Sequence, residues 1–212
     1  MDCEAQREKL IAEIVDREWE MFSQVQNVGG RADCQHDPET FAIMRRSQMQ
    51  TWDLELLQSY KDDLALAKLS GRNLMTEKYA WMMRTTHPDE YEAIKESLPP
   101  VSEEMLRTID EIVAIHLAWR KEVARKYPCL MGHGRPAEET QGTVTSLETY
   151  LRGELMTYSA KTLALYQART LAKQKAGENE AQANLFNQVR QYGFDSLEAC
   201  EAHLAAKAKA QR

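Results

Sequence analysis

The sequence contains few cysteines, four in 212 residues, and no CxxC pair. Cys3, Cys34, Cys129 and Cys200 lie far apart along the chain, a spacing that does not suggest a disulfide framework. The first residues, MDCEAQRE, are too charged for a secretory signal peptide. We therefore expect reduced thiols and a cytoplasmic protein.

Long apolar runs and an excess of basic residues are also lacking. No run approaches the ~20 apolar residues that a transmembrane helix requires, so we expect no membrane association. The formal net charge is -6, whereas a nucleic-acid surface needs clustered Lys and Arg, and the basic tail at residues 207–212 is too short to supply them. These features predict a protein that binds neither membranes nor nucleic acids.

The sequence also lacks the apolar/polar alternation of β-strands, and helix-forming residues dominate it. Apolar residues recur instead at helical spacing. We predict an all-α fold, a helical bundle forming one domain over residues 1–212. Four long helices are expected at 4–26, 37–70, 102–127 and 146–176, with shorter helices at 73–87, 88–98 and after 177. Two long loops, 27–36 and 129–145, separate them.

Each of the four long helices carries polar residues where its apolar stripe should continue. Glu18, for example, lies four residues after Ile14 and four before Phe22, so its side chain faces the expected core. By the same reasoning, the stripe-breaking residues are Glu18, Arg45, Gln48, His116 and Glu154.

A charge in a core is costly unless it is paired, hydrogen-bonded or lines a cavity. Titratable groups in a shared pocket are candidates for acid/base catalysis. We take Glu18, Glu154, His116 and Cys34 as the catalytic candidates. The alternative is purely structural: Glu18 with Arg45 as an interhelical ion pair, and His116 as a core histidine bonded to a backbone carbonyl.

The 27–36 loop has features suited to an anion. Its glycines allow backbone N–H groups to approach an anion closely, and Arg31 is a fork-shaped donor beside them. The alternative is a glycine-rich turn between helices. Our candidate substrate-binding residues are Asn27, Gly29, Gly30, Arg31, Arg45, Gln48, Tyr150 and Tyr158.

Metal binding is the weaker alternative. Cys34 with His36 and Cys129 with His133 are two Cys/His pairs, but neither has a common zinc spacing. The Glu-x-x-His pairs of di-iron bundles are absent around His116, which has Val113 three residues before it. We expect no metal and no cofactor.

Two neighbouring stretches resemble a known family. Asn27-Val-Gly-Gly-Arg-Ala-Asp-Cys-Gln and Thr40-Phe-Ala-Ile-Met-Arg-Arg-Ser-Gln are similar to an uncharacterised bacterial family, a domain of unknown function. The resemblance covers most of the chain and implies a bacterial origin. It implies no particular reaction.

These features lead to one principal functional hypothesis and two alternatives. We expect a small-molecule enzyme, a lyase, isomerase or hydrolase, that uses carboxylate and imidazole groups on an anionic substrate held by arginines. The alternatives are a non-catalytic module that binds a ligand or a protein, and a metal-dependent bundle. Long helices often pair, so a homo-oligomer is compatible with the sequence.

Overall fold

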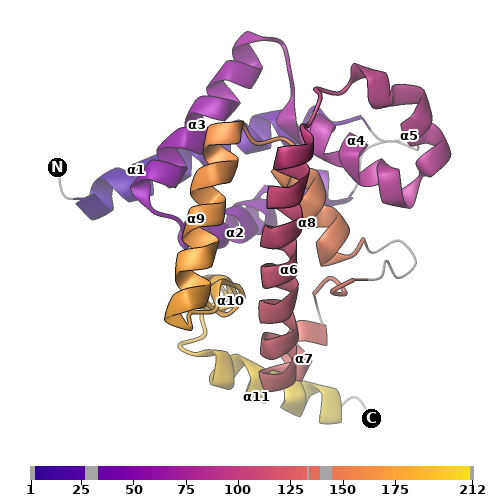
Figure 1. Ribbon diagram of the computed structural model, residues 1–212. Coiled ribbons are helices and arrows are strands. Elements are labelled where there is room, and N and C mark those ends of the chain that lie inside the picture. The colour runs from indigo at the N-terminus through magenta and orange to yellow at the C-terminus, as the bar shows by residue number, and fades with distance from the viewer. Residues whose placement is uncertain (1–2, 27–32, 133, 139–144, 211–212) are drawn as a thin grey trace.

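A computed structural model of the chain describes residues 3–26, 33–132, 134–138 and 145–210, and these are entirely helices, turns and loops (Figure 1). The all-α prediction is confirmed for these residues. The helices are α1 (Cys3–Phe22), α2 (Pro38–Met49), α3 (Leu54–Leu69), α4 (Leu74–Thr86), α5 (Pro88–Ile94), α6 (Glu103–Lys126), α7 (Pro128–Gly132), α8 (Leu147–Leu155), α9 (Ala160–Ala176), α10 (Glu180–Gln191) and α11 (Leu197–Ala210), with short 3-10 turns at Asp33–His36 and Lys95–Ser97.

Two of the four predicted long helices are each divided in two. The expected 37–70 helix breaks before α3, where the Asp53 carboxylate accepts the Leu56 N–H at 2.9 Å. The expected 146–176 helix breaks before α9, where the Ser159 hydroxyl accepts the Thr162 N–H at 3.2 Å. The prediction was wrong here because neither break contains Gly or Pro, and the apolar spacing continues across both.

Other predicted helix ends are confirmed. Asp37 caps α2, Ser102 caps α6 and Ser146 caps α8, each through its side-chain oxygen. Gly177 ends α9 with φ of 73°, a left-handed conformation that glycine adopts without strain. These local signals fix where most helices begin and end.

The helices pack around a main core and a smaller one. In Figure 1, α6 and α9 run side by side, α3 packs on α1 and α9, and α8 packs on α4 and α6. The main core includes the mutually packed rings of Trp52, Tyr60, Tyr158 and Tyr166. The smaller core lies where α7, α10 and α11 meet the end of α6.

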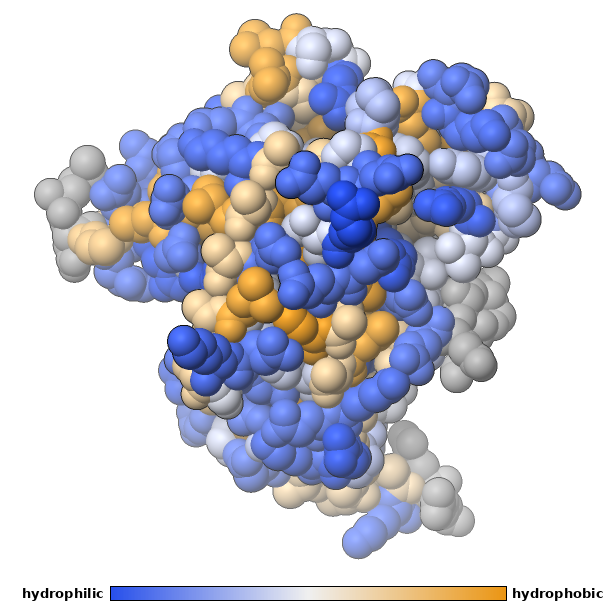
Figure 2. Space-filling model, in the orientation of Figure 1, coloured by the Kyte–Doolittle hydropathy of each residue, from blue (hydrophilic) through white to orange (hydrophobic). Residues whose placement is uncertain are grey.

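The surface is mixed, with isolated apolar side chains. Leu66 and Leu69 are 63% and 86% exposed at the end of α3, and Figure 2 shows apolar groups at that upper end of the molecule. Across the part of the chain that the structure describes, no helix has both the length and the apolar character needed to cross a bilayer.

Gly153 allows α8 and α4 to approach closely. A Cβ at this position would lie 2.7 Å from Cγ of Met82 and 2.8 Å from the carbonyl oxygen of Lys78. We expect Gly153→Ala to lower the free energy of unfolding by about 1–3 kcal/mol through overpacking, measured by urea denaturation. The control is Gly132→Ala, where a Cβ meets no atom within 4 Å. Unfolding of Gly153→Ala at the wild-type urea concentration would contradict the close approach.

Candidate functional site

A buried ionic network joins four helices. Glu18 comes from α1, Arg45 from α2, Lys78 from α4 and Glu154 from α8, and each residue is at most 4% exposed. The four charges comprise two carboxylates and two cations, so the network is neutral as a whole. Helices far apart in the chain thus meet at one set of charged groups.

Arg45 is the centre of this network. Its guanidinium binds both oxygens of Glu18, through Nε at 2.7 Å and Nη2 at 2.5 Å. The same group donates to Glu154 through Nη1 and Nη2, each at 3.1 Å. Lys78 Nζ donates to the other oxygen of Glu154 at 2.6 Å. Such bidentate, charge-assisted bonds are the strongest that side chains make.

Neutral side chains complete the hydrogen bonding. The Tyr60 hydroxyl donates to Glu18 at 2.7 Å, and the Tyr158 hydroxyl donates to Glu154 at 3.0 Å. The Gln48 amide accepts from Arg45 at 2.8 Å and donates to Glu154 at 3.2 Å. Both carboxylates and the guanidinium are therefore well satisfied, as buried charges must be.

The surroundings fix the protonation states of these groups. Burial would raise the pKa of Glu154, but the charges of Arg45 and Lys78 outweigh burial and hold that pKa well below its ordinary 4.5. Burial and the neighbouring carboxylates raise the pKa of Tyr60 and of Tyr158 well above 10. At neutral pH Glu154 is therefore ionised and both phenols are protonated donors.

The network has an outer edge that is only half-buried. Gln48 and Tyr150 are half-exposed, and Lys78 Nζ lies 3.5 Å from the centroid of the Tyr150 ring. The guanidinium carbon of Arg135 lies 4.5 Å from the centroid of the same ring. Two cations thus contact one aromatic ring, an arrangement stabilised by the ring quadrupole.

Six of the candidate residues therefore belong together: Glu18, Arg45, Gln48, Tyr150, Glu154 and Tyr158. The interhelical ion pair between Glu18 and Arg45, which the sequence left as an alternative, is present in the structure. The structure alone assigns no catalytic or binding role to any of them.

His116 lies outside the network. Its Nε2 is 3.1 Å from the Tyr166 hydroxyl, and its ring packs against Trp119 and Tyr166. Burial lowers the pKa of His116 below 6.5, so the imidazole is neutral at physiological pH. His116 is therefore a core histidine, as the structural alternative held, but its partner is a side-chain hydroxyl and not a backbone carbonyl.

The 27–36 loop is only partly described. Asn27, Gly29, Gly30 and Arg31 lie outside the described residues. Cys34 is exposed, and no hydrogen bond or ion pair joins it to the network among the described residues. Its neighbour Gln35 is buried instead. The Gln35 amide donates to the carbonyl oxygens of Phe22 and Val25 at 2.9 and 3.0 Å, and so satisfies carbonyl groups at the C-terminal end of α1.

The metal alternative gains no support from the described parts of the chain. Within them, no group of three or more His, Cys, Asp or Glu side chains is arranged to hold a metal ion. The Cys129 backbone N–H is bound by Glu201 at 2.8 Å, and His133 lies outside the described residues.

Two members of the network were not identified from the sequence. Lys78 lies four residues from both Leu74 and Met82, and Tyr60 lies four from both Leu56 and Leu64. The same four-residue test that selected Glu18 would have found Lys78 as a charge on an apolar face. Tyr60 gives no such signal, because tyrosine is common in cores.

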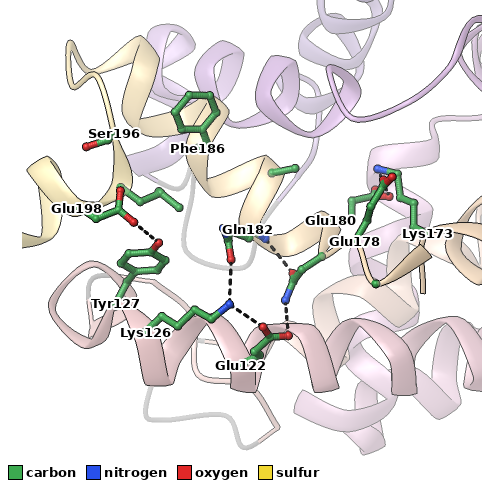
Figure 3. A pocket seen from close by; sticks show the side chains of 14 residues that line it. Glu122, Lys126, Tyr127, Lys173, Glu178, Glu180, Gln182, Phe186, Ser196 and Glu198 are labelled. Atoms are coloured by element: carbon green, nitrogen blue, oxygen red, sulfur yellow. Dashed lines mark hydrogen bonds and ion pairs between the residues drawn. The ribbon is translucent and has the colours of Figure 1, made fainter. Parts of the chain in front are cut away.

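The larger cleft of the molecule lies elsewhere. It has a volume of about 560 Å³ and is lined by the ends of α6 and α9, by α10 and by the start of α11 (Figure 3). None of the described candidate residues lines it. In Figure 3, Glu122 binds Lys126, and Tyr127 donates to Glu198. Glu122 also accepts a hydrogen bond from the Asn179 amide at 3.1 Å. Its polar side chains are thus largely engaged with one another.

Removing one carboxylate from the network should be costly. In Glu18→Gln, Arg45 keeps only Glu154 as a charged partner, which Lys78 also shares. We expect the free energy of unfolding to fall by about 3 kcal/mol, measured by urea denaturation. In Glu20→Gln, which removes only the exposed pair with Lys68, we expect a loss of at most about 1 kcal/mol. Equal losses in the two variants would contradict a stabilising network.

Stability should also depend on the ionisation of Glu154. Because its pKa is lowered in the folded protein, its contribution is complete above about pH 4.5 and is lost as pH falls from there towards the folded-state pKa. We expect the difference in unfolding free energy between wild type and Glu154→Gln to narrow as pH falls from 7 to about 3.5. Urea denaturation at each pH measures it, and a constant difference would contradict the shift.

Comparison with known proteins identifies the family. The family described as "Protein of unknown function (DUF4125)" matches residues 8–202, nearly the whole chain. No curated protein and no solved structure matches the chain. The buried network lies entirely inside the matched range. The chain therefore belongs to the DUF4125 family.

Proposed function

We propose that the protein binds a small anionic molecule at the outer edge of the network, beside Tyr150. The observation that carries this proposal is the contact of two cations, Lys78 and Arg135, with the Tyr150 ring. A cation-rich aromatic surface at the edge of a rigid core is a suitable contact for a planar or charged ligand.

The charge balance at this edge favours an anion. Lys78 is neutralised by Glu154, whereas Arg135 is exposed and has no carboxylate partner among the described residues. Arg135 also lines a hollow of about 180 Å³. The edge therefore retains positive charge that a ligand can neutralise.

The contacts favour ligand binding without catalysis over acid/base catalysis. Glu18 and Arg45 are saturated by their partners, and His116 contacts Tyr166 instead of the network. The catalytic version, acid/base chemistry of a lyase, isomerase or hydrolase, requires Glu154 to lose a cation. A ligand anion that drew Lys78 away would raise the pKa of Glu154 and make it a stronger base.

The larger cleft is less suitable for such a ligand. Four carboxylates and two ammonium groups line it, those of Glu122, Glu178, Glu180 and Glu198 with Lys126 and Lys173. An anion entering it meets a net negative charge, so like-charge repulsion disfavours binding.

A ligand screen tests the proposal. We expect at least one organic acid, acidic amino acid or nucleotide to raise the melting temperature, because a ligand at 100 times its Kd adds about 2.7 kcal/mol, or roughly 5–10 °C for a chain of this size. The shift should disappear in Tyr150→Leu, which loses the ring, and persist in Tyr150→Phe, which keeps it. Turnover of that ligand by wild type, but not by folded Glu154→Gln, would establish the catalytic version.

Two results would contradict the proposal. One is the absence of any stabilising anion across the screen. The other is a shift of equal size in wild type and Tyr150→Leu, since the ligand would then bind away from the ring.

A further inference from the structure

Arg120 is a half-buried arginine on α6 without a carboxylate partner in the described parts of the chain. Its Nη2 donates to the carbonyl oxygen of Arg135 at 2.7 Å. Both arginines line the hollow of about 180 Å³, together with Lys121, Ala124, Met131 and Pro136. Among the described residues, no carboxylate lines this hollow.

Partial burial disfavours the charged form of Arg120. Burial lowers the pKa of Arg120 below 12.5, and no charge in the described parts of the chain acts in the opposite direction. The fully buried cations Arg45 and Lys78, by contrast, are both paired with carboxylates. A desolvated cation without a counterion is unfavourable, so a bound anion would stabilise it.

The remaining charges around the hollow leave an excess of two positive charges. Lys121 binds Glu138 at 2.8 Å, so that pair is neutral. Arg120 and Arg135 make no ion pair with the described residues. Two uncompensated arginines therefore lie at one hollow.

Arg120 is also held in position by the backbone. A Cβ at Gly134 would lie 2.6 Å from Nη2 of Arg120, so the guanidinium lies close against the chain there. Together with the bond to the Arg135 carbonyl, this contact reduces the freedom that Arg120 would lose on binding a ligand.

We propose that Arg120 and Arg135 bind a phosphate monoester group of the ligand. The inference rests on the proposed function, because it names the charged group of the anionic ligand. A phosphate dianion matches the two uncompensated charges, and guanidinium groups bind its oxygens in bidentate geometry. A hollow of about 180 Å³ is smaller than a typical ligand pocket of about 300 Å³ or more, so it admits the charged group and leaves the rest of the molecule outside.

Titration with inorganic phosphate at constant ionic strength tests this site. We expect a saturable rise in melting temperature for the wild-type protein. Arg120→Gln should weaken phosphate binding about tenfold or more, because it loses a charge-assisted donor. Arg84→Gln, the same change at an exposed arginine of α4, should leave binding unchanged. Arg120→Lys keeps the charge without the fork and should bind with intermediate strength.

Titration with malonate, a dicarboxylate, in place of phosphate distinguishes the charged group. Stabilisation by malonate but not by phosphate would overturn the phosphate assignment. So would the absence of a phosphate effect on wild type, or an equal effect on wild type and Arg120→Gln. The melting temperature of Arg120→Gln without phosphate shows whether that variant is folded, and Arg120→Lys supplies the comparison if it is not.

These experiments distinguish a failure of the phosphate site from a failure of the proposed function. A phosphate effect that needs Arg120, with no larger anion that needs Tyr150, would support this site and overturn the proposed function. A larger anion that needs Tyr150, with no phosphate effect, would overturn this site and support the proposed function.

Discussion

The pairing of Arg45 with Glu18 and Glu154 is the interaction on which the rest of the structure depends. A buried guanidinium without partners would cost several kcal/mol, a large share of the stability of a domain. Both carboxylates must therefore reach the same side chain within hydrogen-bond distance. This requirement fixes α1, α2 and α8 relative to one another, and Lys78 adds α4. A buried network of this kind specifies one arrangement of helices more strictly than apolar packing does.

The centre and the edge of the network differ in how completely their polar groups are paired. Glu18 and Arg45 already have all the partners their charges need, whereas Tyr150 and Arg135 are partly open to solvent. The Tyr150 ring contacts Lys78, which is bonded to Glu154, so an anion bound at the ring would act directly on the charge balance of the core. A ligand that binds the folded protein at this edge would raise its stability by mass action.

Helix periodicity predicts which residues face the core, whereas the packing of helices decides what those residues contact. Glu18, Arg45, Gln48 and Glu154 were found by their spacing from apolar neighbours, and they contact one another because each projects from a core-facing stripe. His116 satisfies the same spacing but meets Tyr166, because α6 presents that residue to α9. Spacing gives the face of a helix and leaves its partner undetermined.

The sequence by itself determined the all-α class, most helix caps and the positions of the charges that face the core. These properties follow from contacts within a few residues, such as the Asp37 cap and the left-handed Gly177. Only the tertiary structure decided the helix breaks ahead of α3 and α9, the participation of Lys78 and Tyr60, and the position of Arg120 at a hollow. Those features depend on how distant helices pack, and local spacing carries no information about that packing.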